Sequence, residues 1–220
     1  MIGTVLDRPM REKTWIRPVT AVAAVLCTVI ACAAGARADM TVKGDAAAWA
    51  EVGAAYKKLS SLPGYRIKFS AGPQTMVMEA VPPDSFHTTV QASSGTIETV
   101  SVKGQTRYRM NMPGAPTGWQ CRGGPPVQAP RDPSKDIQGT VEISRGADTA
   151  IEGMPVHTYI YTITPSATGQ GGTGKTTLYV GTQTGLPRRS VVSSPGGEST
   201  LDFYDYGANI IITLPACGQS

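Results

Sequence analysis

The chain has 220 residues, of which 16% are charged, with 20 basic and 16 acidic side chains. Residues 1–38 hold five of these basic and two of these acidic residues, so 15 and 14 remain beyond residue 38. These nearly equal numbers of basic and acidic residues give no support for the strongly basic surface typical of nucleic-acid-binding proteins. About 180 residues suit one core, and we expect a single domain over residues 39–220.

The first forty residues have the pattern of an export signal. Basic residues up to Arg17 precede an uncharged stretch, and Ala36-Arg37-Ala38 matches an A-x-A cleavage site. We predict a signal peptide over residues 1–38 and a soluble periplasmic protein. A second processing route stays open: Val29-Ile30-Ala31-Cys32 resembles a lipobox, in which Cys32 would be acylated and would anchor the protein to a membrane.

Two cysteines, Cys121 and Cys217, lie beyond residue 38. In an oxidising compartment an even pair predicts a disulfide. Metal ligation is the alternative, but it needs further ligands at a spacing that the chain lacks.

One helix is predicted at the start of the domain. Asp45 can cap it, and apolar residues from Trp49 to Leu59 recur at helical spacing. Pro63-Gly64 ends it. Beyond residue 64 the pattern alternates with period two, which predicts strands joined by short turns in antiparallel meanders. The candidate strands are 65–70, 75–81, 85–92, 96–103, 105–112, 139–145, 150–152, 156–164, 175–181, 188–193, 199–206 and 209–214.

Residues 113–133 interrupt this pattern with six prolines and four glycines. Such a segment is predicted to be an extended loop. Lys135-Asp136-Ile137 after it is compatible with a short helical turn.

Gly169, Gly174, Lys175 and Thr176 match the spacing of a phosphate-binding P-loop. That loop must open a helix whose amides face the phosphates. Residues 177–180 are instead β-branched and aromatic, which predicts a strand. We therefore expect a hairpin turn and no ATP binding.

No catalytic or metal-binding constellation is recognisable. The chain has two histidines, His87 and His157, and neither lies at the spacing of a metal-binding motif. Both lie in predicted strands, so we expect half-buried strand residues rather than catalytic bases. Asp202 and Asp205 have opposite parity on a strand and so cannot act as a carboxylate pair. We expect no enzymatic activity, no cofactor and no metal.

Apolar side chains gather on alternating strand positions. Methionine is flexible and polarizable, which suits a wall for variable apolar ligands, but ordinary core filling is the alternative. The candidate ligand-lining residues are Trp49, Met76, Met78, Tyr108, Met110, Met112, Tyr159, Tyr161, Leu201 and Phe203.

Several segments resemble the periplasmic lipoprotein carrier LolA and related outer-membrane lipoprotein-sorting proteins, and more distantly LprG-like lipoproteins. The segments are Tyr56-Lys57-Lys58-Leu59, Met78-Glu79-Ala80-Val81-Pro82-Pro83-Asp84, Lys103-Gly104-Gln105-Thr106-Arg107-Tyr108, Thr184-Gly185-Leu186-Pro187-Arg188-Arg189 and Asp205-Tyr206-Gly207. LolA itself has a basic residue near the position of Val81, where this chain has none.

The resemblance implies an α+β, mostly antiparallel fold: an unclosed half β-barrel of about ten to eleven strands, covered by one long N-terminal helix and short helical turns. It implies a non-enzymatic carrier that holds lipid or lipoprotein acyl chains in an apolar cavity and meets a partner protein of the inner or outer membrane. The alternative is a periplasmic sensor of the same fold, like the binder of an anti-sigma factor, that acts through protein–protein contact.

Overall fold

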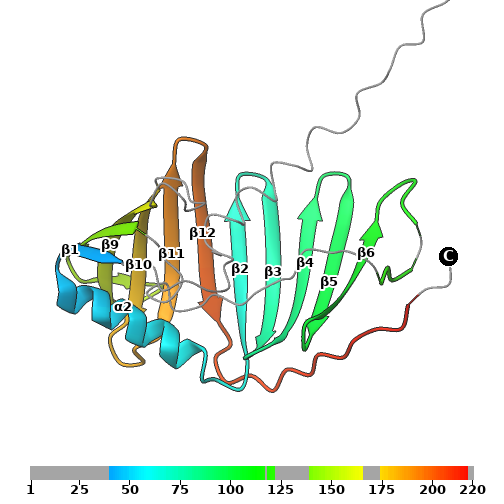
Figure 1. Cartoon of the computed structure of the whole chain (residues 1–220), viewed down its shortest axis with the longest axis horizontal. Helices are drawn as coiled ribbons and strands as arrows, with labels where there is room; N and C mark the ends of the chain where they lie inside the picture. Colours follow the sequence, from blue (N-terminus) through cyan, green and yellow to red (C-terminus); the bar gives the residue numbers. More distant parts are fainter. Residues whose placement is uncertain (1–39, 117, 122–138, 166–173, 218–220) are drawn as a thin grey trace, which may run out of the picture.

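The computed structural model describes residues 40–116, 118–121, 139–165 and 174–217. In these ranges it contains one helix and twelve strands (Figure 1). The elements are β1 (Thr41–Gly44), α2 (Ala46–Leu59), β2 (Tyr65–Ala71), β3 (Gln74–Val81), β4 (Ser85–Ala92), β5 (Gly95–Val102), β6 (Gln105–Asn111), β7 (Gly139–Arg145), β8 (Thr149–Ile151), β9 (Met154–Pro165), β10 (Lys175–Gly181), β11 (Pro187–Ser194) and β12 (Gly197–Tyr204).

The strands form one open sheet in the order β1-β7-β9-β10-β11-β12-β2-β3-β4-β5-β6, with β8 paired to β9. Two antiparallel meanders, β2–β6 and β7–β12, are joined side by side through the β12–β2 ladder. The predicted half-barrel of mostly antiparallel strands is confirmed, with one strand more than the upper expectation.

Helix α2 begins where the sequence predicts. The Asp45 side chain accepts a hydrogen bond from the Ala48 amide at 2.9 Å, which satisfies one of the free donors of the first turn. Lys57 and Lys58 lie in the last turn, where a positive charge is favourable. The buried face of the helix packs on β1, β7 and β11, so α2 covers only one end of the sheet (Figure 1).

Strand β1 was not predicted. It pairs in parallel with β7, and the Asp45 amide donates to the carbonyl of Ile143 at 3.0 Å. Gly44 makes this entry possible: its φ is +88°, and a Cβ there would lie 2.2 Å from the Ile143 oxygen.

The predicted strand over residues 209–214 is wrong. After β12 the chain leaves the sheet, and residues 207–217 form no ladder, although they carry four aliphatic side chains. The Gly207 amide donates to the Gly64 carbonyl at 2.8 Å. This C-terminal segment then runs along the sheet towards β6 (Figure 1).

The P-loop-like match has the structure of a strand. Residues 175–181 form β10, paired on both sides, so no helix follows Gly174. Gly169 and the predicted turn at residues 135–137 lie outside the described residues, as do Cys32 and the predicted signal peptide. Within the described ranges no helix is both long and apolar enough to cross a bilayer.

Candidate ligand-binding face

One face of the sheet, here called the inner face, is apolar across both meanders. Residues opposite each other in adjacent antiparallel strands point to the same side. The pairing register therefore aligns one continuous row on nine strands. The row is Tyr159, Leu178, Ser190, Leu201, Phe69, Met76, Val90, Ile97 and Met110.

Most of the candidate ligand-lining residues fall on this face. Tyr159, Leu201, Met76 and Met110 belong to the row itself. A second row holds Phe203, Ile67, Met78, Thr88, Thr99 and Tyr108. Tyr161 pairs with Thr176 one row away. Met112 falls just beyond β6, where Ser94 donates to its sulfur at 3.5 Å, so it lies at the end of the sheet.

The inner face has two halves of different character. Under α2, Trp49 packs edge-on against Tyr161 at 5.5 Å between ring centroids, and Tyr56 packs against Phe203 at 6.4 Å. Tyr159 and Phe203 are almost fully buried. These aromatic side chains pack in the hydrophobic core between α2 and the sheet.

The other half, formed by β2–β6, lies away from α2 (Figure 1). Exposure rises along it: Met76 and Met78 on β3 are 6% and 3% exposed, whereas Tyr108 and Met110 on β6 are only half-buried. Val90 and Ile97 belong to the same row and were missed by the sequence analysis. The pairing of two adjacent hairpins could have identified them, because it aligns them with Met76 and Met110.

Polar groups close the inner face where it meets the start of α2. The Tyr159 hydroxyl donates to Glu51, and Arg145 lies 3.7 Å from the same carboxylate. Burial and the hydrogen bond to Glu51 raise the pKa of Tyr159, so it stays a neutral donor. His157, half-buried as predicted, lies 2.7 Å from Arg145 and 3.0 Å from Asp148.

The opposite face, here called the outer face, carries all the charges of β2–β6. Arg66 bonds Glu79 at 2.8 Å and Asp205 at 2.7 Å. His87 lies between Glu79 at 3.3 Å and Glu98 at 3.8 Å. These contacts form a ladder of alternating charge across the strands.

Two aspartates near the end of β12 do not form a pair. Asp202 bonds Arg189 at 2.5 Å, and Asp205, just beyond the strand, bonds Arg66. Asp205 follows β12 with a φ of +53°, so the prediction from strand parity does not hold for it: both carboxylates bond arginines of the outer face.

The C-terminal segment lies over this outer face. It forms a cleft of about 220 Å³ with β4, β5 and Trp119. Arg109, which bonds Glu98 at 2.8 Å, also stacks over the Trp119 ring at 4.9 Å. The lining residues are His87, Glu98, Val100, Trp119, Ile211, Ile212, Thr213 and Pro215.

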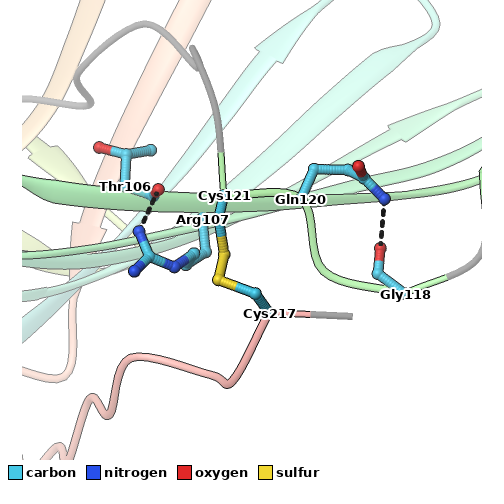
Figure 2. Close-up of a disulfide and its surroundings, with 6 residues drawn as sticks. All are labelled: Thr106, Arg107, Gly118, Gln120, Cys121 and Cys217. Carbon is cyan, nitrogen blue, oxygen red and sulfur yellow. Dashed lines mark hydrogen bonds between the residues drawn. A yellow bond between two sulfur atoms is a disulfide. The ribbon is translucent and has the colours of Figure 1, made fainter. Parts of the chain in front are cut away.

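The predicted disulfide is present and fastens the C-terminal segment. Cys121 and Cys217 are bonded beside Arg107, with 5.7 Å between their Cα atoms (Figure 2). Gln120 pairs with Tyr108 through two backbone hydrogen bonds, which holds Cys121 against the edge strand β6. No group of three or more potential metal ligands occurs in the ranges that the structure describes.

No protein-family model matches the sequence, and no curated protein matches it. Solved structures do share the fold. The lipoprotein LppX of Mycobacterium tuberculosis matches with a TM-score of 0.56 and 10% identity, over 77% of this chain and 100% of LppX. LprF of Mycobacterium bovis matches with a TM-score of 0.51 and 14% identity, over 79% of this chain and 99% of LprF. These matches confirm, for the fold, the predicted resemblance to LolA-like and LprG-like proteins.

Proposed function

We propose that the protein is an exported, non-enzymatic binder or carrier of lipid or lipoprotein acyl chains. The observation that supports this most is the apolar row that continues away from α2, from buried Met76 on β3 to half-buried Val90, Ile97 and Met110 on β4–β6. Apolar surface in contact with water is unfavourable, and a buried acyl chain gains about 0.8 kcal/mol per CH₂. The ligand-lining residues proposed lie in the half formed by β2–β6, here called the uncovered half because it lies away from α2: Met76, Met78, Tyr108 and Met110.

One fold relative, LppX, is described as a lipoprotein, which agrees with an exported protein but does not assign a ligand. The direct test is native mass spectrometry of the protein isolated from its own source. A carrier co-purifies with lipid masses that disappear on delipidation. A homogeneous ligand-free mass, unchanged by incubation with lipid vesicles, would refute the proposal.

A variant on β6 tests where the acyl chain lies. Met110→Asp places a charge on the inner face, and we expect acyl uptake to fall at least tenfold because the charge must be desolvated. Asn111→Asp is the matched control: it adds the same charge one residue away, at an exposed position of the same strand. Fluorescent fatty-acid titration measures both, and equal affinities in the two variants would contradict this placement.

A second candidate function is the predicted sensor that acts through protein–protein contact. Ile211 favours it, because this aliphatic side chain is 81% exposed beside the cleft on the outer face. Ile211→Asp would then abolish complex formation with the partner and leave acyl uptake unchanged. The same native mass spectra separate the two functions, since a sensor would appear as a protein complex without lipid.

A further inference from the structure

In the uncovered half of the inner face, the polarity of the side chains changes from one end of the strands to the other. The row of Phe69, Met76, Val90, Ile97 and Met110 is entirely apolar. Two rows away, at the other end of the same strands, the register aligns residues rich in hydroxyl groups. This hydroxyl row is Tyr65, Ala80, Phe86, Ser101 and Thr106.

The hydroxyl groups of the uncovered half make only weak hydrogen bonds within this half. Thr106 donates to the Ser101 hydroxyl at 3.4 Å, and Thr88 in the row between donates to the Thr99 carbonyl at 3.5 Å. Both are long hydrogen bonds. Ser101 and Thr88 are nevertheless buried.

No residue in these three rows of β2–β6 carries a formal charge. The charged residues of the same strands, such as Lys68, Glu98 and Arg109, alternate with them and therefore point to the outer face. A buried anionic headgroup would find no cation within these three rows. An isolated buried charge is strongly unfavourable, whereas a neutral polar group needs only a hydrogen bond.

Within these three rows, the Tyr65 hydroxyl is a buried group without such a bond. Its side chain is fully buried, and its hydroxyl makes no hydrogen bond with any described residue. Two other tyrosine hydroxyls do have partners: Tyr159 donates to Glu51, and Tyr206 donates to the Phe203 carbonyl at 2.8 Å. An unpaired buried hydroxyl is destabilising and indicates a missing partner.

Tyr65 also lies at the right place for an amphiphilic ligand. It begins β2, the strand that borders the helix-covered half through the β12–β2 ladder. From the Tyr65 row to the Phe69 row is four residues, or about 13 Å along a strand. One leaflet of a bilayer's hydrocarbon core is about 15 Å thick, so an acyl chain can span the two rows.

We propose that the Tyr65 hydroxyl donates a hydrogen bond to an uncharged acceptor of the bound lipid, an ester carbonyl, while the acyl chain extends over the Met76–Met110 row. The ligand class is thus a neutral acyl ester whose linkage is buried, and Tyr65 is a specificity-determining residue. This inference rests on the proposed function.

The test uses three probes that share a chain of similar length: methyl oleate, oleate at pH 8, and octadecene. They are titrated into the delipidated mature protein and into its Tyr65→Phe variant, which keeps the ring and removes the hydroxyl. In the wild type methyl oleate should bind tightest and oleate weakest. In Tyr65→Phe the affinity for methyl oleate should fall roughly tenfold, to that of octadecene, whose own affinity stays the same.

Tyr206→Phe is the matched control, because its hydroxyl already has protein partners. Its thermal midpoint should fall while all three affinities hold, whereas the midpoint of unliganded Tyr65→Phe should not fall. If methyl oleate binds wild type and Tyr65→Phe equally, or if oleate binds as tightly as its ester, this inference is wrong and the proposed function stands. If none of the probes binds, both are wrong.

Discussion

At the scale of single residues, alternation along β2–β4 separates two kinds of chemistry. Arg66, Glu79 and His87 meet on the outer face, while their neighbours Ile67, Met78 and Phe86 are buried on the inner face. Burial alone would raise the pKa of Glu79, but hydrogen bonds from Arg66 and His87 outweigh it and lower the pKa. The carboxylate is therefore more stable in the folded protein than in the unfolded chain.

This shift makes Glu79 a source of pH dependence. A carboxyl group whose pKa is lower in the folded state stabilises the protein above its unfolded pKa, and this stabilisation is lost as the pH falls through the folded pKa. We expect Glu79→Gln to be less stable than the wild type at pH 7, with the difference shrinking below pH 4. Urea unfolding at a series of pH values measures it.

The control for this series is Glu198→Gln, at an exposed position that forms no ion pair with a described residue. Its stability should follow the wild-type curve at every pH. A difference between wild type and Glu79→Gln that is constant from pH 7 to pH 3 would show that the lowered pKa contributes nothing to stability.

At the scale of elements, α2 depends on its first turn, because this helix brings Trp49 and Tyr56 onto the sheet. Asp45→Ala removes the acceptor of the Ala48 amide, and we expect a loss of about 1 kcal/mol in the free energy of unfolding. Asp45→Asn keeps an acceptor oxygen and should restore most of it. Chemical denaturation followed by Trp fluorescence tests both, and equal stability of Asp45→Ala and wild type would contradict the cap.

Local patterns predicted most elements, because helical and period-two spacing are properties of short segments. Two failures have one cause, which is that strands need partners. Residues 41–44 have a weak pattern but pair with β7, nearly a hundred residues away. Residues 209–214 have strong β-forming side chains but leave the sheet after β12, so their propensity has no ladder to join.

The candidate site was predictable in composition but not in extent. Parity placed the methionines and tyrosines on shared faces, and the register confirmed it. Which half α2 covers depends on a non-local contact between residues 46–59 and strands beyond residue 139. Tyr161 and Met110 therefore look equivalent in the sequence, although one lies in the core and the other on the uncovered half.

At the scale of the whole molecule, the two halves have different origins in the chain. The helix-covered half combines residues 41–59 with 139–204, whereas the uncovered half is the single segment 65–111. The β12–β2 ladder and the Cys121–Cys217 bond join them.

The disulfide closes a separation of 96 residues, which in the chain-entropy model stabilises by about 4–5 kcal/mol. We expect the double variant Cys121→Ser, Cys217→Ser to lose up to this amount with its far-UV circular dichroism unchanged, since neither cysteine belongs to a strand. Each single variant should lose as much as the double one. A single variant as stable as the wild type would show that the bond contributes no stability.

The same bond encloses β7–β12 in a covalent ring. A protease cut at any one peptide bond between Cys121 and Cys217 opens this ring without releasing a fragment, so the nicked protein keeps its mass in a non-reducing gel, apart from one added water. Only a reducing agent would separate the two pieces. The protein would therefore stay in one covalent piece after its backbone has been cut.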